Sequence, residues 1–377
     1  MKILLDGRKL GDTGIGTYVL ELLRELTLLS EDDRFLVVLR SDEQRLLLRK
    51  FPQIETVICP VPVFSLREQT LFRRLERSFG PDLIHMPHCN VPLQVSAPVI
   101  CTLHDLIPLQ FKSEIPGLAA RGYYYWMNRM ALKRSRAVIV PSPVTEGAIR
   151  EYFGDATAPV HVIAEASAPV FNGRSEGTVW ARIQDKWHIR FPYLLTVGLL
   201  KPHKQWHYAV DLLHALRTQH GRHDLHLLMA GPENARQDAC LRETIERYRL
   251  ENVVHTLGRV ETEELLYLYQ NAWALVFPSA QEGFGLPVLE AMACGAPVLG
   301  FDYPWLVYVG QPAVLTAPPG DTDALATVAM AQLGMPAMRA RWQVKVRAHA
   351  SMFSWQKAAC QTRELYDQVV HVSAIAG

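Results

Sequence analysis

The feature that most constrains this chain is the stretch 276–300. It consists of an apolar run, a glycine loop, an expected helix and a second apolar run, in this order. Residues 275–277 are typical of a buried parallel strand, and residues 297–300 of the next one. Pro287 suits the first turn of the helix between them, and Gly295 suits its C-cap. Such a unit places backbone N–H groups and a helix N-terminus at the carboxyl edge of a sheet, which favours phosphate binding.

Two carboxylates frame this glycine loop. Glu282 precedes the glycines, and Glu290 lies about one turn inside the helix. A carboxylate can accept hydrogen bonds from both hydroxyls of a vicinal diol, and such diols occur on ribose and on hexoses. The pair therefore favours a nucleotide sugar over a bare nucleotide. The alternative is a buried helix start with incidental acids on solvated turns. Because Glu282 falls in a loop, we expect it to be exposed and to contribute little to stability.

Length and composition fit a protein of two domains. A chain of 377 residues is long for one domain, and a hydrophobic content of 49% supports sizeable cores. The net charge of +1 provides no global field for binding nucleic acid. The six cysteines are scattered without a C-x-x-C motif, which predicts reduced core residues of a cytosolic protein. We find no secretory segment and no membrane span.

Two further loops carry candidate chemistry. Residues 11–16 form a G-x-x-G-x-G run between an expected strand at 3–5 and a helix starting near Thr17. This layout fits a phosphate loop, but it also fits a turn that only needs positive φ. His104 and Asp105 follow an expected strand at 99–103, at the carboxyl edge where doubly wound sheets bind ligands. The alternative for them is a hydrogen-bonded structural pair.

Two expected helices carry alternatives of their own. The helix 66–79 alternates arginines with apolar residues, which fits a solvated face over a core or contact with anionic lipid. The helix 118–135 is rich in Tyr and Trp, which we expect to lie mostly in the core. Stacking on an acceptor sugar or contact with a membrane interface is the alternative.

The remaining expectations concern caps and a linker. Residues 165–191 show few periodic patterns and are predicted to be the interdomain linker. Ser142 is expected to cap a helix. The D-x-D formed by Asp321 and Asp323 is interpreted as a helix cap, not as a metal site.

Three motifs resemble a known family. The run E-G-F-G-L-P-V-L-E, 282–290, resembles the E-x7-E motif of retaining glycosyltransferases of family 4, which have the GT-B fold. The run V-G-L-L-K-P-H-K-Q, 197–205, resembles the family's V-G-x-x-x-P-R-K-N, although His203 and Gln205 replace the usual Arg and Asn. The run H-D-L-I-P, 104–108, and the glycine loop are most similar to bacterial mannosyltransferases and rhamnosyltransferases of surface polysaccharide assembly.

The resemblance implies roles for individual residues. Glu282 would lie by the transferred sugar, Glu290 would hold the donor ribose, and Lys204 would hold the pyrophosphate. His104 would reach the transferred sugar, and Asp105 would orient the imidazole or assist the acceptor hydroxyl. Further donor-binding positions would be Gly14, Gly16, Gly198, Val260, Gly283, Phe284, Gly285 and Leu286.

The fold implied is α/β of the GT-B type, with two Rossmann-like domains facing a central cleft. The acceptor-binding domain would span 1–170 together with a returning helix at 355–377, and the donor-binding domain would span 171–354. The function implied is transfer of a hexosyl group to a hydroxyl of a glycan or lipid-linked glycan, without a metal ion or a cofactor. Among the possible donors we favour GDP-mannose, which would supply a mannosyl group. Alternatives are a non-catalytic nucleotide-sugar-binding partner of a glycan-assembly complex and a sugar-nucleotide epimerase. We expect a cytoplasmic protein, with peripheral membrane contact through the helix 66–79 as an additional possibility.

Overall fold

The computed structural model divides into two compact units, Met1–Glu165 with Ser354–Gly377, and Ala166–Phe353. It describes residues 1–377 except 64, 66, 156–157, 174–176, 232–234 and 377, and side chains 235–240 and 373–376 are also left undescribed. The expected start of the basic helix at residue 66 and the side chain of Cys240 therefore lie outside the described part. We refer to the two parts as unit 1 and unit 2.

Unit 1 is built on a parallel sheet with the order β3-β2-β1-β4-β5-β6-β7. Its strands are short apolar runs, and β4, β5 and β6 are buried along their whole length, as expected where helices cover both faces of a sheet. The strands are β1 (Lys2–Asp6), β2 (Arg34–Leu39), β3 (Ile54–Ile58), β4 (Leu83–Met86), β5 (Val99–Thr102), β6 (Ala137–Val140) and β7 (Val160–Val162).

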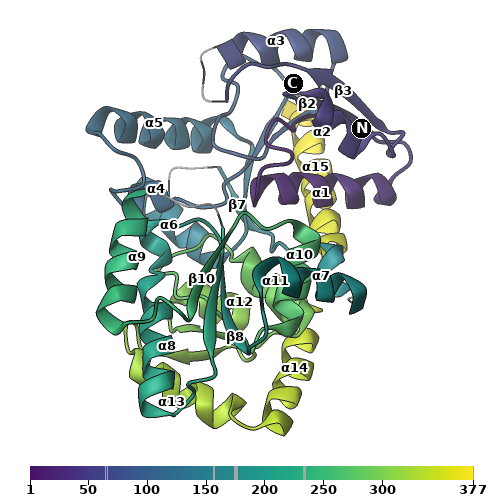
Figure 1. Ribbon diagram of the computed structural model, residues 1–377. Helices are drawn as coiled ribbons and strands as arrows, with labels where there is room; N and C mark the ends of the chain where they lie inside the picture. Colours follow the sequence, from purple (N-terminus) through teal and green to yellow (C-terminus); the bar gives the residue numbers. More distant parts are fainter. Residues whose placement is uncertain (64, 66, 156–157, 174–176, 232–234, 377) are drawn as a thin grey trace. The chain divides into compact units, whose positions relative to one another are not determined.

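The helices of unit 1 include the C-terminal helix, which runs beside α1 in Figure 1. Helix α1 buries Leu22, Leu23 and Leu26 on one face. Helix α15 buries Tyr366, and its Arg363 forms an ion pair of 2.7 Å with Asp33. The helices are α1 (Ile15–Leu29), α2 (Asp42–Leu48), α3 (Arg67–Phe79), α4 (Ile107–Gln110), α5 (Leu118–Arg134), α6 (Pro143–Phe153) and α15 (Trp355–Ala376).

Unit 2 contains a second parallel sheet, with the order β10-β9-β8-β11-β12-β13. The chain turns back at β8 and β11, which are neighbours although two strands separate them in sequence. In doubly wound sheets, ligands bind at the carboxyl ends of the strands at this switch point. The strands are β8 (Tyr193–Val197), β9 (His226–Ala230), β10 (Val254–Gly258), β11 (Ala274–Val276), β12 (Val298–Phe301) and β13 (Leu315–Ala317).

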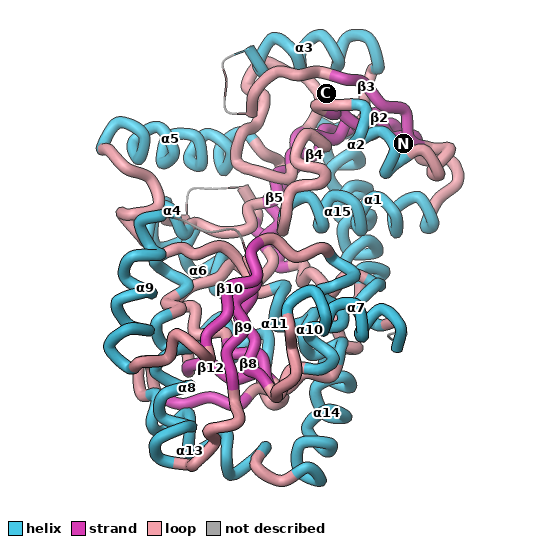
Figure 2. Tube along the Cα trace, viewed as in Figure 1, coloured by secondary structure: helices cyan, strands magenta, loops and turns pink. Residues whose placement is uncertain are grey.

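Helices flank the second sheet, as Figure 2 shows for β8, β9 and β10. Apolar residues of α8 and α13 form one continuous core with β8, β9 and β12. The helices are η1 (Pro169–Asn172), α7 (Gly177–Trp187), η2 (Pro202–Lys204), α8 (His207–Gln219), α9 (Ala235–Tyr248), α10 (Thr262–Asn271), α11 (Leu286–Cys294), α12 (Pro304–Gly310), α13 (Thr322–Leu333) and α14 (Pro336–Ala350). No helix in the described part of the chain is long and apolar enough to span a membrane.

The α/β class with two Rossmann-like sheets is confirmed, and so are both predicted caps. The hydroxyl of Ser142 accepts a hydrogen bond from the backbone N–H of Thr145 at 3.3 Å. The carboxylate of Asp321 accepts one from the N–H of Ala324 at 2.9 Å. These two side chains satisfy donors that the first turn of a helix leaves without partners.

Two expectations about local structure were wrong. The predicted linker 165–191 contains the helix α7, which buries Ile183 despite the glycines and serines around it. The expectation that the aromatic residues of α5 lie mostly in the core holds for Tyr124 and Tyr125, which pack against the core, but was wrong for the other two. Tyr123 and Trp126 are 42% and 44% exposed and stack on each other at 6.0 Å. Helical periodicity instead gives the buried face to Met127, Ala131 and their neighbours.

The basic helix α3 has the geometry of a solvated face over a core. Phe72 is buried, and Leu71, Leu75 and Phe79 pack against the core of unit 1. The four arginines lie on the exposed side: Arg67, Arg73, Arg74 and Arg77. The apolar side of α3 is therefore already used, so that any contact with lipid would rest on charge alone.

Candidate active site

The loops after β8 and β11 meet at the switch point of unit 2. Lys204, at the end of η2, places its Nζ 2.6 Å from Oε1 of Glu282 in the loop after β11. The same Nζ lies over the ring of Phe277, 4.9 Å from its centroid. Only 13% of the Lys204 side chain and 11% of the Glu282 side chain are exposed. The structure thus brings together the cation predicted for a diphosphate and the carboxylate predicted for a sugar.

The expectation that Glu282 is an exposed loop carboxylate was wrong. The loop folds back on η2, because the N–H of Ala280 donates to the carbonyl oxygen of His203 at 2.8 Å. This contact buries Glu282 and pairs it with Lys204. The side chain of His203, which replaces the usual Arg, is itself buried and is 3% exposed. Lys204 is therefore the cation that this loop presents next to Glu282.

The N-terminus of α11 is shaped by a glycine packed on an indole. Gly285 is the N-cap of α11 and has φ of +101°, a conformation that only glycine adopts readily. A Cβ at this position would lie 2.6 Å from the ring of Trp305. Pro287 lies in the first turn, and no side chain caps this helix end. Its first N–H groups and the positive end of its dipole suit an anion.

Glu290 lies one turn inside α11 and faces the hydroxyl of Tyr269, which donates to Oε2 at 3.1 Å. Burial raises the pKa of Glu290 to about 7, although the hydrogen bond from Tyr269 acts in the opposite direction. Burial, followed by the Glu290 carboxylate, raises the pKa of Tyr269 well above its ordinary value. Glu290 is therefore a carboxylate whose charge changes near neutral pH.

The other predicted residues of unit 2 contribute backbone and shape. Phe284 is 4% exposed, and its ring packs edge-to-face on Phe353 at 5.9 Å. A Cβ added to Gly198 would lie 3.8 Å from Cε of Lys204, so this glycine lies beside the lysine. Gly283 and Leu286 flank these residues in the loop and at the start of α11, and Val260 follows β10.

In unit 1, His104 and Asp105 follow β5 at the carboxyl edge of the sheet. Nδ1 of His104 lies 2.8 Å from Oε1 of Glu165, which follows β7 at the same edge. Asp105 instead accepts a hydrogen bond from the N–H of Ile107 at 3.0 Å, at the start of α4. The carboxylate that orients the imidazole is thus Glu165, and the expectation that Asp105 might do so was wrong.

The glycine loop of unit 1 ends in the helix α1. Gly14 is its N-cap with φ of +72°, and no side chain caps this end. A Cβ on Gly16 would lie 2.7 Å from the carbonyl oxygen of Lys9, so the loop closes tightly on itself. Gln44 fixes the preceding turn, because its amide donates to the carbonyl oxygens of Arg8 and Leu10. This tight turn with positive φ at Gly14 is the backbone that both a phosphate loop and a simple turn require.

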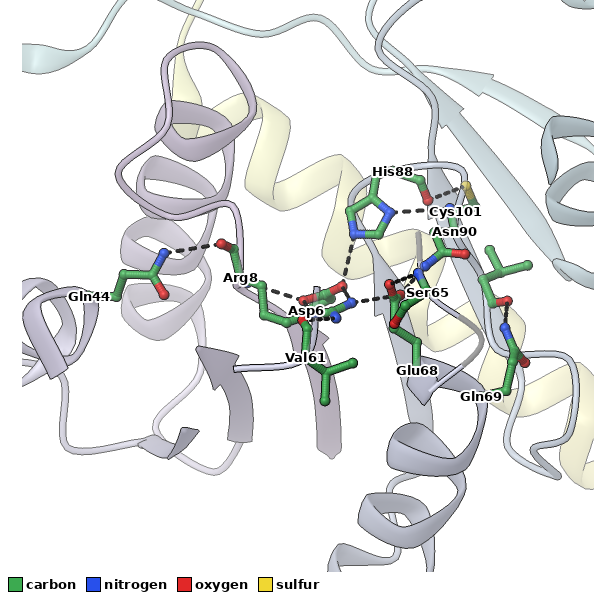
Figure 3. Close-up of polar contacts among 11 residues, drawn as sticks. Asp6, Arg8, Gln44, Val61, Ser65, Glu68, Gln69, His88, Asn90 and Cys101 are labelled. Atoms are coloured by element: carbon green, nitrogen blue, oxygen red, sulfur yellow. Dashed lines mark hydrogen bonds and ion pairs between the residues drawn. The ribbon is translucent and has the colours of Figure 1, made fainter. Parts of the chain in front are cut away.

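A buried polar cluster surrounds Asp6 and Arg8, which precede this loop in the sequence (Figure 3). Arg8 binds Asp6 through two nitrogens, at 2.8 and 2.6 Å, and reaches Glu68 of α3 at 2.9 Å. His88 contacts Asp6 at 2.8 Å, and Asn90 contacts Glu68. Burial alone would raise the pKa of Asp6, but the hydrogen bonds from Arg8 and His88 hold it well below its usual range. Sequence reasoning missed this cluster, although Asp6 ends a strand at the binding edge.

The predicted site residues fall into two sets. Gly14, Gly16, His104 and Asp105 belong to unit 1, and the remaining predicted residues belong to unit 2. Within unit 2, the contacts join Lys204 to Glu282. Within unit 1, the ring of Tyr18 on α1 packs edge-to-face on His104 at 4.7 Å. The described residues contain no group of three or more His, Cys, Asp or Glu side chains arranged to hold a metal ion.

Two glycosyltransferase family models match the chain. Residues 182–349 match the model for glycosyl transferases group 1, and residues 13–165 match the model for glycosyltransferase family 4. The two matched segments fall in unit 2 and unit 1, respectively. The chain is therefore a glycosyltransferase of the family 4 type.

Known proteins and solved structures resemble this chain over nearly its whole length. The chain is 26% identical to O-antigen chain mannosyltransferase B of Escherichia coli over 373 residues. The aligned region covers 94% of this chain and 96% of that protein. A sucrose-phosphate synthase from Thermosynechococcus elongatus matches with a TM-score of 0.77 and 21% identity, over 99% of this chain and 100% of that one. Anabaena HepE in complex with UDP-glucose matches with a TM-score of 0.77 and 19% identity, over 98% and 100%. These structures establish the GT-B fold.

Proposed function

We propose that this glycosyltransferase moves a mannosyl group from GDP-mannose to a hydroxyl of a glycan or lipid-linked glycan, with retention at the anomeric carbon. The observation that carries the proposal is the contact of 2.6 Å between Lys204 and Glu282. This contact lies at the switch point of unit 2, in the loop that leads into the uncapped N-terminus of α11. It places a cation for a leaving diphosphate beside a carboxylate for a sugar hydroxyl.

The leaving diphosphate is the group whose charge grows during the reaction. Lys204 and the first N–H groups of α11 would stabilise that charge as the bond to the sugar breaks, with help from the glycine loop around Gly16. In the structure, Glu282 neutralises Lys204. A bound diphosphate would share this lysine, and Glu282 would turn to the sugar. We propose that these groups suffice without a metal ion, as the family resemblance implies.

The family resemblance implies which side chains would hold the transferred sugar and the donor ribose. Glu282 and His104 would orient its hydroxyls while the ring takes on oxocarbenium character, and Glu290 would hold the donor ribose. The acceptor hydroxyl would attack from the side of the leaving group. A diphosphate oxygen would take the acceptor proton, so that no protein nucleophile is required.

The choice of GDP-mannose rests on the relatives and can be tested directly. The O-antigen relative is named a mannosyltransferase, whereas Anabaena HepE was solved with UDP-glucose. A thermal-shift panel should compare GDP-mannose, UDP-glucose, UDP-N-acetylglucosamine, UDP-galactose and dTDP-rhamnose, with EDTA and with magnesium. A ligand at a hundred times its dissociation constant adds about 2.7 kcal/mol of stability. A rise in the melting temperature caused by GDP-mannose in EDTA supports the proposal. A rise caused by UDP sugars alone would mean that the donor is a UDP sugar and not GDP-mannose.

Catalysis and stereochemistry need separate measurements. Slow hydrolysis of the donor without acceptor distinguishes a transferase from a non-catalytic binding partner. An epimerase would instead convert the donor to another nucleotide sugar, which chromatography detects. The anomeric coupling constant of the product, measured by NMR, decides whether the donor configuration is retained. An inverted product would contradict the proposed attack from the leaving-group side.

Cytoplasmic location with peripheral membrane contact through α3 forms the last part of the proposal. The four exposed arginines of α3 would attract an anionic surface, at about 1 kcal/mol for each residue near the lipid. Flotation with vesicles of phosphatidylglycerol should retain the protein at low salt. Replacing Arg73 and Arg77 by Gln should weaken this binding, and vesicles of neutral lipid provide the control. Equal binding of both proteins would contradict the role of α3.

A further inference from the structure

The imidazole of His104 is fixed by a carboxylate that the proposed reaction leaves without a role. Nδ1 lies 2.8 Å from Oε1 of Glu165, whose side chain is 5% exposed. A carboxylate only accepts hydrogen bonds, so Nδ1 must carry the hydrogen in this contact. In the neutral ring, Nε2 then carries a lone pair. This contact therefore sets the tautomer of His104.

The rest of the surroundings of His104 prevent the ring from turning away. Tyr18 packs edge-to-face on the imidazole at 4.7 Å, and its hydroxyl is fixed by Thr102 at 2.9 Å. The hydroxyl of Thr145 donates to the carbonyl oxygen of His104 at 3.3 Å. The main chain, the ring face and Nδ1 of His104 are thus each held by a different element of unit 1.

One polar atom of this ring is left over. Nε2 of His104 is buried and has no hydrogen-bond partner among the described residues. A buried polar group without a partner destabilises the folded protein, and a ligand that supplies the partner recovers the lost free energy. Because the ring is held on its other sides, Nε2 is the atom of His104 that is available to a substrate.

We propose that Glu165 is a positioning residue that keeps His104 in the Nδ1–H tautomer, so that Nε2 accepts a hydrogen bond from a hydroxyl of the sugar substrate. The identity of the substrate in this inference rests on the proposed function, whereas the tautomer of His104 does not. Glu165 acts through His104 and does not touch the substrate itself. When the sugar lacks the recognised hydroxyl, the enzyme should bind the transition state of transfer about 10- to 100-fold less tightly.

The tautomer can be measured without any substrate. Protein labelled with ¹⁵N-histidine gives long-range ¹H–¹⁵N correlations that distinguish the Nδ1–H from the Nε2–H form, and His104→Gln assigns the signals. We expect the Nδ1–H form in the wild type above pH 7.5 and a shift toward the Nε2–H form in Glu165→Met. An Nε2–H tautomer in the wild type, or an unchanged tautomer in Glu165→Met, would overturn the proposal even if the donor assignment holds.

Kinetics then test the consequence for transfer. Glu165→Met should lower kcat/KM about 10- to 100-fold, whereas Glu165→Gln, which keeps an acceptor oxygen, should recover part of the loss. The matched control is Glu146→Gln on α6, because Glu146 pairs with Arg150 at 3.3 Å and that arginine is 67% exposed. Wild-type kcat/KM in a folded Glu165→Met protein would refute the positioning role. If no donor is turned over at all, the proposed function fails, and the NMR result still decides the tautomer.

A panel of deoxy sugars identifies the hydroxyl. The wild type should lose kcat/KM with one particular deoxy donor or acceptor. Glu165→Met should lose little more with that same analogue, because the hydrogen bond is already weakened. Equal losses in the wild type and the variant for every analogue would mean that His104 recognises no hydroxyl through Nε2.

Discussion

Replacing Glu290 by Gln should make the protein more stable at alkaline pH while weakening the binding of the donor. Burial raises the pKa of Glu290 to about 7 from 4.5, its value in the unfolded chain. Between these two values the folded protein holds a proton that the unfolded chain has released. The stability contributed by Glu290 is therefore complete below pH 4.5 and is lost as pH rises through 7.

The size of this effect follows from the two pKa values. From pH 5 to pH 8 the penalty for ionising this partly buried carboxyl grows by about 2.5 kcal/mol. Glu290→Gln cannot ionise and keeps an oxygen that can accept from Tyr269. The stability of the variant relative to the wild type, measured as the difference in their free energies of unfolding, should thus be about 2.5 kcal/mol greater at pH 8 than at pH 5.

The assay is urea unfolding of both proteins at the two pH values, followed by calorimetric titration with donor. Other titrating groups contribute equally to both proteins and cancel in the difference. For the wild type, donor affinity should rise roughly tenfold from pH 6 to pH 8, because only the ionised carboxylate accepts from both ribose hydroxyls. A stability difference that does not change with pH would refute the assignment of the raised pKa. Undiminished donor affinity in Glu290→Gln would refute the ribose role.

The remaining predictions concern three residues of the candidate site in unit 2 and one histidine pair of the same unit. Glu282→Ala should abolish transfer and also lower stability by about 1–3 kcal/mol, because it leaves the buried Lys204 without its partner; transfer assays and urea unfolding measure both. Lys204→Ala should weaken the calorimetric affinity for the nucleotide diphosphate at least tenfold, and an unchanged affinity would argue against this lysine as the diphosphate ligand. Gly285→Ala should be destabilising by about 1–3 kcal/mol in urea unfolding, since its Cβ would lie 2.6 Å from Trp305 and φ is positive. Burial, and then the neighbouring His255, lowers the pKa of His226 to about 4, so stability should be lost as pH falls from 6.5 toward 4, and His226→Gln should flatten this dependence in thermal unfolding.

The sequence predicted the elements whose chemistry is local. The loop before α11 was predictable because an apolar run, Gly285, Pro287 and Gly295 each restrict the backbone within a few residues. The strands β3 and β13 were not predicted. β3 is an edge strand of mixed polarity without a fully buried residue, and β13 has only three residues. Pattern reasoning needs longer runs than these.

The missed parts of the site depend on contacts between distant residues. Glu165 lies 61 positions from His104, and only the neighbouring positions of β5, β6 and β7 in the sheet bring them together. A polar residue shortly after a strand at the binding edge was the available indication. The burial of Glu282 was missed because it depends on a contact with Lys204, 78 positions away. Periodicity within one segment carries no information about either pairing.

The return of α15 to unit 1 has a consequence for synthesis of the chain. Asp33 binds the amino group of Met1 at 2.7 Å and Arg363 of α15 at 2.7 Å, so one buried carboxylate joins β1 to a helix that follows unit 2 in the sequence. Unit 2 is one continuous segment, Ala166–Phe353, and all of its residues leave the ribosome before α15 does. The larger part of unit 1 is made first, but its helix α15 is made only after unit 2. On a ribosome, unit 1 therefore cannot be completed before all of unit 2 has been synthesised.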